Sequence, residues 1–416
     1  MQLRRVVITG IGTINPLGHN SEEFFTNLLN GVSGAGPITR FDASGMKTRF
    51  ACEVKNYKPA DFGLDRKEER KMDLFSQFAM ISADEAIRDS GLELDKENLD
   101  RFGVIWGSGI GGIETLFQEA GGYFEGGRVP RFSPFLIPKM IPDIAPGLIS
   151  MKYGFRGPNF ATVSACASST HAMCDAFTYV RLGKADVILT GGSEAGITIP
   201  SVGGFNSAQA LSTNNEEAAT ASRPFDKTRD GFVMGEGGAA LMFEEYEHAV
   251  ARGAKIYAEV AGCGMSADAH HITASHPEGL GAILAMRFAL EDAEMQPDEI
   301  DYVNVHGTAT PVGDPAELKA VKTVFGEHAY KLNISSTKSM TGHLLGGTGA
   351  VEALACICAI RRSMIPPTIN FEHEDPEIDY TLNLTLNKAQ PRKVRAALSN
   401  TFGFGGHNSS VIFKAL

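Results

Sequence analysis

The stretch RVVIT at residues 5–9 is an apolar strand pattern that leads into glycine turns, and residues 21–29 (SEEFFTNLL) then form a capped amphipathic helix. The same order recurs at residues 255–268 (KIYAEVAGCGMSAD), which predict a strand and a turn, with a helix expected over residues 279–293. Alternating strands and helices indicate an α/β protein. The repeated order predicts two similar halves, residues 1–255 and 256–416. With no Ser/Gly linker between them, we expect one compact unit.

The bulk composition predicts a soluble, globular protein. The chain has 416 residues, of which 43% are hydrophobic and 21% charged, and it contains no uninterrupted apolar stretch long enough to span a membrane. The N-terminus enters a strand pattern without a secretory signal, which predicts a cytoplasmic location. A formal net charge of −11 argues against broad nucleic-acid binding. We therefore expect neither a nucleic-acid nor a membrane partner.

Cysteine spacing and glycine loops exclude two further classes of site. The six cysteines are scattered, and the pair Cys356 and Cys358 lies in an apolar helical run, so we expect buried packing residues and no metal site. The glycine-rich stretches at residues 6–18 and 107–112 (GSGIGG) are poor dinucleotide loops, because Asn15 replaces the third glycine in the first and the second lies too deep in the chain. The Gly- and Pro-rich residues 110–150 are expected to cover the core.

Cys166 is the first candidate for chemistry. It stands in residues 161–195 (ATVSACASSTHAMCDAFTYVRLGKADVILTGGSEA), where small residues separate a strand-like lead from a helical pattern that runs through Leu182. A thiol at the turn into a helix faces unpaired N–H groups and the positive end of the helix dipole, and both favour the thiolate. Taken alone, a cysteine among alanines is more often a buried structural residue.

Two histidines at strand ends favour the catalytic reading. His306 follows the strand-like run in residues 301–318 (DYVNVHGTATPVGDPAEL), and His343 follows a strand candidate in residues 333–360 (NISSTKSMTGHLLGGTGAVEALACICAI). A histidine at a strand end is rigidly held and faces a cleft, whereas one on an apolar face is more often a core residue.

Charged residues flank His343 on both sides. Lys338 lies five residues before it and Glu352 nine residues after it, so the two are expected to pair beneath the imidazole, although a surface ion pair is the ordinary alternative. A further segment, residues 399–408 (SNTFGFGGHN), places two phenylalanines among glycines and predicts either a mobile loop or an ordinary turn that closes the sheet.

Taken together, these segments resemble the β-ketoacyl-acyl carrier protein synthases. The resemblance rests on five motifs in the same order and at the same spacing: SACASS, RPFDKTRDGFVMGEG (residues 223–237), HGTATPVGD, SSTKSMTGHLLGGTGAVE and SNTFGFGGHN. It covers essentially the whole chain, and the length and the GSGIGG segment most resemble the elongating, type II members. It implies a thiolase-like α/β fold, with a five-layered αβαβα core built from two similar halves, and a homodimer.

The resemblance also implies roles for the candidate residues. Cys166 would take an acyl chain from acyl carrier protein, with an oxyanion hole formed by the backbone N–H groups of Cys166 and Phe404. His306 and His343 would stabilise the enolate that forms when malonyl-acyl carrier protein loses CO₂. No cofactor is expected, since substrates arrive on the phosphopantetheine arm of the carrier.

Further residues are assigned by the same resemblance. Lys338 and Glu352 would hold His343 in orientation. Six further residues would contact substrate. Thr308 and Thr310 would hydrogen-bond the phosphopantetheine arm. Phe404 would form the gate before the nucleophile, with Phe402 behind it, and Ile110 and Phe205 would line the acyl tunnel. Basic residues would offer a patch to the acidic carrier, or else form a solvated face: Arg66, Lys67, Arg70, Lys71 and Arg131.

Two departures and two alternatives remain open. The nucleophile segment lacks the Gly and Asn that many members have, and Gln209 replaces a common basic residue, which bears on carrier contact and acyl preference. A chain-elongating ketosynthase of polyketide or aryl-polyene assembly would share every catalytic residue named. A catalytically silent partner subunit would usually lack the cysteine, which is present here.

Overall fold

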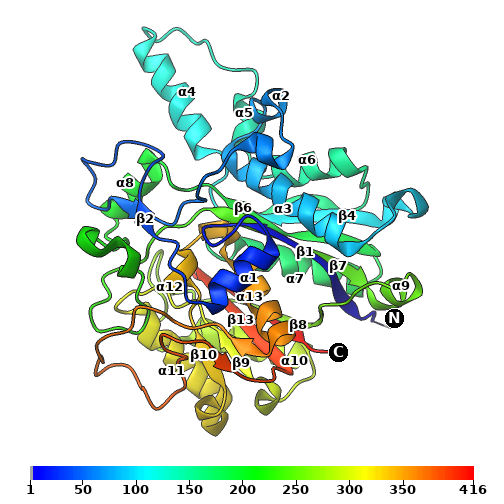
Figure 1. The fold of residues 1–416 in the computed structure, drawn as a ribbon, viewed down its shortest axis with the longest axis vertical. Coiled ribbons are helices and arrows are strands. Elements are labelled where there is room, and N and C mark those ends of the chain that lie inside the picture. Colours follow the sequence, from blue (N-terminus) through cyan, green and yellow to red (C-terminus); the bar gives the residue numbers. More distant parts are fainter. Residues whose placement is uncertain (1–2) are drawn as a thin grey trace.

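The computed structural model describes residues 3–416 (Figure 1). The predicted first strand is longer than expected, since β1 spans Val6–Ile14 and every residue in it is buried. The predicted helix is α1, Ser21–Leu29, in which the Asn20 side chain accepts a hydrogen bond from the Glu23 N–H and so caps the first turn. The opening α/β pattern is therefore confirmed.

A single mixed sheet of ten strands runs through the described residues, in the order β10-β9-β13-β14-β8-β1-β7-β6-β4-β5. The strands of one side are β4 (Phe102–Gly107), β5 (Asn159–Thr162), β6 (Val187–Glu194) and β7 (Gly237–Glu245), beside β1. Those of the other side are β8 (Ala258–Ala267), β9 (Tyr302–Asn304), β10 (Asn333–Ser335), β13 (Ala396–Gly403) and β14 (His407–Lys414).

The two sides of the sheet repeat one another. Counted outward from the centre of the sheet, the strand orders are β1-β7-β6-β4-β5 on one side and β8-β14-β13-β9-β10 on the other. On each side the first two pairs of neighbours are antiparallel and the last two are parallel. β1 and β8 join the sides through a short antiparallel ladder in which Val6 faces Val260. This repeat of order and direction supports two similar halves, although the exact boundary at residue 255 remains a prediction.

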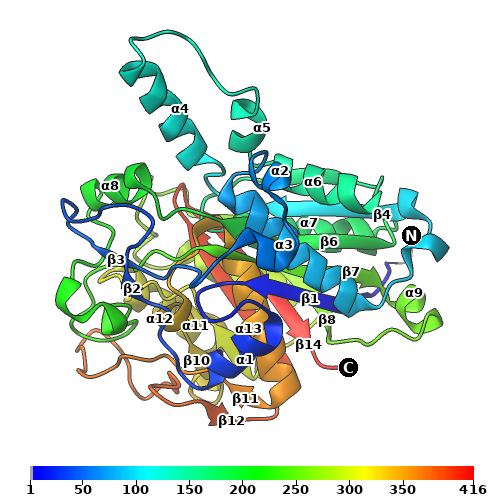
Figure 2. The ribbon, with the colours of Figure 1, turned by 45° about the horizontal axis from the view of Figure 1, so that its top comes forward.

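Helices form three layers around the two sides of the sheet (Figures 1 and 2). α7 (Ser168–Arg181) and α13 (Thr348–Arg362) form the central layer, and their side chains share one apolar cluster with both sides. α3 (Leu74–Ser90) and α6 (Ile144–Tyr153) cover one outer face, and α10 (Leu280–Asp292) and α11 (Gly313–Phe325) the other. The predicted five-layered arrangement is confirmed.

The central position of α13 explains why the helical run around Cys356 and Cys358 is apolar. α13 is enclosed on every side, and Cys356 and Cys358 are fully buried in it. A helix with no solvated face packs in the interior of a protein. The two cysteines are therefore packing residues, as predicted.

Residues 110–150 depart from the expectation that they cover the core. α4 (Ile113–Glu125) and α5 (Leu136–Met140) project away from the layers, and α6 alone returns to pack on them (Figures 1 and 2). The projecting part leaves large apolar side chains exposed, including Leu116, Phe117, Phe124, Phe132 and Ile137. The density of glycine and proline does not distinguish a segment that projects from the layers from one that packs over the core.

Shorter elements complete the chain: β2 (Gly36–Pro37), β3 (Phe50–Ala51), α2 (Arg66–Glu69), α8 (Ile199–Ser207), α9 (Tyr246–Ala251), α12 (Lys338–Thr341), β11 (Met364–Ile365) and β12 (Gln390–Pro391). Among residues 3–416, none of the helices combines the length and the apolar character needed to cross a membrane.

Candidate active site

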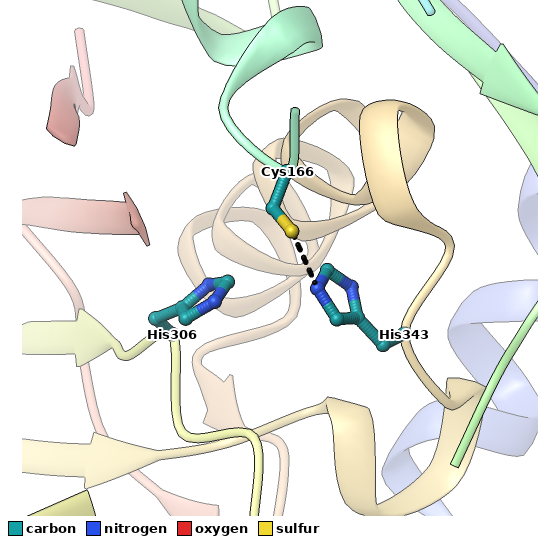
Figure 3. Close-up of side chains that lie close together, drawn as sticks. All are labelled: Cys166, His306 and His343. Atoms are coloured by element: carbon teal, nitrogen blue, oxygen red, sulfur yellow. Dashed lines mark hydrogen bonds between the residues drawn. The ribbon is translucent and has the colours of Figure 1, made fainter. Parts of the chain in front are cut away.

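Three loops at the ends of core elements bring Cys166, His306 and His343 together (Figure 3). Cys166 precedes α7, His306 follows β9, and His343 lies between α12 and α13. His343 Nε2 lies 3.0 Å from Cys166 Sγ. The two imidazole rings stand nearly perpendicular, with centroids 5.3 Å apart. The sequence-predicted set is thus assembled around one point.

The backbone around Cys166 forms a sharp turn between β5 and α7. Ala165 adopts a left-handed conformation, φ 51°, which L-residues rarely occupy. The Ser168 hydroxyl holds the turn, because it donates to the Ala165 carbonyl at 2.6 Å and accepts the Ser164 N–H at 2.9 Å. The turn presents the thiol to the cavity ahead of the helix.

The thiol is not the ready thiolate that the helix position suggested. Burial raises the pKa of Cys166 to about 11, and this outweighs the opposing effects of the Lys338 charge and of the backbone N–H groups of Phe404 and Cys166. The backbone N–H groups lower the pKa, as the sequence reasoning expected, but that reasoning omitted the larger cost of desolvating an anion. Both N–H groups lie at the sulfur, and their role as an oxyanion hole stays a prediction.

Thr348, which the sequence reasoning missed, fixes the orientation of His343. Its hydroxyl accepts the Leu344 N–H at 2.9 Å, and its proton is therefore free to bond His343 Nδ1 at 3.1 Å. The Leu345 N–H also points at Nδ1, at 3.3 Å. Since Nδ1 accepts from both sides, Nε2 carries the ring proton and directs it at Cys166.

The Lys338–Glu352 pair forms as predicted, but in the interior and not at the surface. Lys338 Nζ bonds Glu352 Oε1, and each side chain is 2% exposed. Among residues 3–416, neither side chain hydrogen-bonds to the His343 ring, whereas Thr348 does, and the orienting role of Lys338 and Glu352 stays a prediction. The pair acts through charge, because burial first and the Lys338 ammonium second hold the pKa of His343 well below its usual range.

His306 is held by a buried carboxylate that the sequence reasoning also missed. Glu317 accepts the backbone N–H groups of His306 and Gly307 at 2.8 Å each, and the Asn400 amide at 3.3 Å. Burial, together with the Lys338 and His343 charges, keeps the pKa of His306 well below normal. Both imidazoles are therefore neutral near pH 7. Glu317 lies within the quoted HGTATPVGDPAEL segment, but its position eleven residues after the histidine carried no recognisable signal.

A cavity of about 370 Å³ opens onto the three residues. Every residue predicted to bind substrate lines it: Thr308, Thr310, Phe402, Phe404, Ile110 and Phe205. Phe232 lines it as well and packs its ring 5.2 Å from that of His343. Phe232 belongs to the quoted GFVMGEG motif, whose contribution to the site became visible only in the fold.

The GSGIGG stretch binds a carboxylate of the chain itself. Glu194 is fully buried and accepts the backbone N–H groups of Gly109, Ile110 and Gly111. It also accepts the Gly346 N–H, next to the His343 loop. A glycine loop used as an internal anion cradle is consistent with the exclusion of a dinucleotide site.

One group of donor atoms in the site is of the kind that holds a cation. Single atoms of Cys166, His306 and His343 lie within 4.8 Å of one another. The same three residues carry the chemistry that the sequence predicts for the site.

The predicted basic patch is exposed throughout. Arg66 and Lys67 lie in α2, Arg70 and Lys71 follow it, and Arg131 lies in the loop between α4 and α5. Acidic residues are interspersed on α2, so the surface is mixed in sign. The patch remains a prediction.

Comparisons with known proteins identify the family. The family model "Beta-ketoacyl synthase, N-terminal domain" matches residues 3–249, and "Beta-ketoacyl synthase, C-terminal domain" matches residues 257–372. The chain belongs to the beta-ketoacyl synthase family.

Curated relatives match over full length. The 3-oxoacyl-[acyl-carrier-protein] synthase 2 of Synechocystis sp. is 48% identical over 414 residues, covering 100% of this chain and 99% of that protein. The protein of the same name from Staphylococcus aureus (strain COL) is 48% identical and covers 99% of each chain. A solved type II PKS ketosynthase in complex with its acyl-carrier protein (AntDE:AntF) is 32% identical, with a TM-score of 0.90 and full coverage of both chains.

Proposed function

We propose that this chain is an elongating 3-oxoacyl-acyl carrier protein synthase of type II fatty-acid synthesis, which condenses a Cys166-bound acyl chain with malonyl-acyl carrier protein. The observation that carries the proposal is a cavity-facing thiol that lies 3.0 Å from His343 Nε2, with donor atoms of both histidines and the thiol within 4.8 Å of one another and the pKa of both imidazoles lowered. Full-length relatives named for this activity support the assignment.

The first half-reaction transfers the acyl group to Cys166. The sulfur attacks the thioester carbonyl, and the N–H groups of Cys166 and Phe404 stabilise the oxyanion that develops. The carrier thiol leaves with the proton that Cys166 gives up, so the exchange is balanced. Because the resting thiol is neutral, its proton departs only as the sulfur bonds to carbon.

The second half-reaction supplies a carbon nucleophile by loss of CO₂. As the malonyl carboxylate breaks away, its electron pair moves to the thioester oxygen, where the N–H groups of His306 and His343 stabilise the enolate. The enolate carbon attacks the acyl-Cys166 carbonyl, and the Cys166 sulfur leaves and takes one proton from solvent. The products are the 3-oxoacyl thioester on the carrier and CO₂. Since decarboxylation drives the step, the proposed chemistry needs no resident cofactor.

Neutral histidines suit this step better than charged ones. A neutral imidazole donates a hydrogen bond without giving a proton to the enolate and quenching it. Burial first, and the Lys338 charge second, hold the pKa of both rings well below its usual range and so keep them neutral. This gives Lys338 and Glu352 an electrostatic part in the reaction without contact with substrate.

Acyl carrier protein and a second copy of the chain are the proposed partners. The exposed basic residues on and after α2, with Arg131, would meet the acidic carrier. The second copy would cover the apolar side chains of the α4–α5 extension and the free edge of β5, with Val163, which directly follows β5 and is 60% exposed. Sedimentation of the purified chain tests the dimer, and fractionation of cells tests the predicted cytoplasmic location.

The polyketide alternative keeps one specific support, the likeness to a type II PKS ketosynthase bound to the hexaketide. A silent partner subunit is disfavoured, because the complete Cys-His-His set is assembled at the cavity. Purified protein incubated with malonyl carrier and saturated acyl carriers of graded length separates the two active functions. Turnover of saturated chains is expected, and its absence would defeat the fatty-acid proposal.

A further inference from the structure

The loop that carries Thr308 and Thr310 has an unusual backbone. Residues 307–312, here the threonine loop, connect β9 and His306 to α11 without helix or strand of their own. Ala309, at the centre, is fully buried with φ 61°, in the left-handed region that residues with a side chain rarely adopt. The two hydroxyls beside it lie 3.3 Å apart and face the cavity. Such a backbone persists only where neighbouring structure holds it.

A distant segment holds three consecutive carbonyls of this loop. The Gly231 N–H donates to the Ala309 carbonyl at 3.1 Å. Arg229 Nε donates to the Thr310 carbonyl at 3.1 Å, and Arg229 Nη2 donates to the Pro311 carbonyl at 3.0 Å. One guanidinium therefore spans two adjacent peptide groups, which is a use of its planar fork that a lysine ammonium cannot copy.

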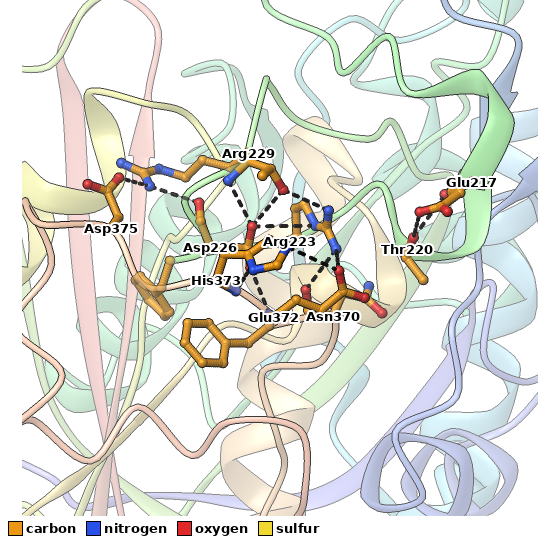
Figure 4. A network of polar contacts seen from close by, with 12 residues as sticks. Glu217, Thr220, Arg223, Asp226, Arg229, Asn370, Glu372, His373 and Asp375 are labelled. Atoms are coloured by element: carbon orange, nitrogen blue, oxygen red, sulfur yellow. Dashed lines mark hydrogen bonds and ion pairs between the residues drawn. The ribbon is translucent and has the colours of Figure 1, made fainter.

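Arg229 is itself fixed from behind. Its side chain is 2% exposed, and Nη1 donates to the Asp226 carbonyl at 2.9 Å and to Asp375 Oδ2 at 2.5 Å (Figure 4). Asp226 in turn accepts the backbone N–H groups of Glu372 and His373 at 2.7 Å each. The network links residues 223–231 to the loop at residues 370–375, so the guanidinium has little freedom to shift.

Burying a charged group in this way calls for a reason beyond stability. A buried ion pair is seldom more stabilising than apolar side chains of the same size, so its value lies in fixing one geometry. Arg229 does not line the cavity and cannot touch a substrate there. What it fixes is the backbone whose other side presents Thr308 and Thr310 to the cavity.

We infer that Arg229 is a positioning residue for the carrier-borne thioester: by holding the Thr310 and Pro311 carbonyls, it sets the two threonine hydroxyls where the phosphopantetheine arm binds. This inference rests on the proposed function, in which both substrates enter on that arm. It assigns to the RPFDKTRDG segment a task in substrate binding that its distance from the thiol conceals.

The matched control is a second arginine of the same network. Arg223 donates to the Thr228 hydroxyl and the Asn370 carbonyl and pairs with Glu372, but makes no bond to the threonine loop. Arg229→Lys should raise the KM for malonyl-carrier protein at least tenfold, in an assay of CO₂ release, with kcat within threefold. Arg223→Lys should lower the melting temperature by about as much as Arg229→Lys does. It should nevertheless leave the KM for malonyl-carrier protein within twofold of the wild-type value. Equal KM effects in the two variants would overturn the inference.

A double-mutant cycle separates positioning from general structure. If Arg229 acts through the two hydroxyls, Arg229→Lys should add no further increase in KM to a Thr308→Ala/Thr310→Ala protein. Independent, multiplicative effects would overturn the inference. Should Arg229→Lys fail to fold, Asp375→Asn loosens the same guanidinium and should raise KM about two- to fivefold, and an unchanged KM there would also refute it.

The CO₂-release assay needs the arm but no acyl chain. An enzyme that releases CO₂ normally yet condenses no saturated acyl chain would defeat the fatty-acid proposal and leave the Arg229 inference standing. A normal KM in Arg229→Lys, together with normal condensation of saturated acyl chains, would refute the Arg229 inference and leave the fatty-acid proposal standing.

Discussion

Thr348 gives a sharp test of how His343 works. Thr348→Val keeps the shape of the side chain and removes the hydroxyl that lies between the Leu344 N–H and His343 Nδ1. The site is 2% exposed, so water cannot replace the lost partner. An unsatisfied buried N–H costs about 1–3 kcal/mol of stability. A hydrogen bond of this kind has a net value of about 0.5–1.5 kcal/mol, which corresponds to a loss of about 2- to 13-fold in rate if it serves only the transition state.

The assay is release of CO₂ from malonyl-carrier protein, with acylation of Cys166 followed in parallel by intact-protein mass spectrometry. Acylation should be unchanged, since the hydroxyl acts on the imidazole and not on the sulfur. Thr348→Ser is the control, because it keeps the hydroxyl and removes only a methyl group. The reasoning fails if the valine variant releases CO₂ at the wild-type rate, or if serine loses as much as valine.

Four further outcomes are expected. Cys166→Ala should abolish acylation, while His343→Ala should leave acylation intact and block CO₂ release; full condensing activity in His343→Ala would contradict its assigned role. Lys338→Met should destabilise the fold by about 3–5 kcal/mol by leaving Glu352 unpaired, and adding Glu352→Gln should recover much of this in chemical denaturation. The rate of CO₂ release should not change as the pH falls through 6.5, because the pKa values of His306 and His343 in the folded protein lie well below that value. The free energy of unfolding should decrease over the same range, because the two imidazoles take up protons in the unfolded chain and not in the folded one. A midpoint in the rate near pH 6.5 would argue against buried neutral rings. Zinc should inhibit reversibly, with recovery on chelation, because donor atoms of Cys166, His306 and His343 lie within 4.8 Å of one another. Enzyme whose Cys166 is acylated beforehand should resist inhibition. Equal inhibition of the acylated form would refute zinc binding at the thiol.

Most catalytic candidates were predictable because their signals are local. His306 and His343 each follow a short strand, so residue type and secondary structure selected them, and only together with them did Cys166, at a strand-to-helix turn, become the candidate nucleophile. The resemblance of their motifs to one family added the reaction. Glu352 was selected as the partner of Lys338, fourteen residues before it, although the burial of the pair was not visible in that spacing.

The missed residues owe their roles to contacts between distant segments. Glu317 matters because α11 returns its carboxylate to the backbone of His306, and Phe232 because its loop packs against His343. Arg229 reaches the threonine loop across 81 positions of sequence. No periodicity or local motif reports such contacts.

The sequence by itself was enough to predict the α/β class, the repeated halves and the candidate nucleophile with its two histidines, because strand and helix patterns and chemically distinctive side chains are properties of short segments. Only the tertiary structure decided the ionisation of the site. Burial raises the pKa of the Cys166 thiol to about 11 against the opposing Lys338 charge, whereas burial and the Lys338 ammonium together hold the pKa of both imidazoles well below its usual range. Desolvation depends on everything that surrounds a group, and that surrounding is assembled from both halves of the chain.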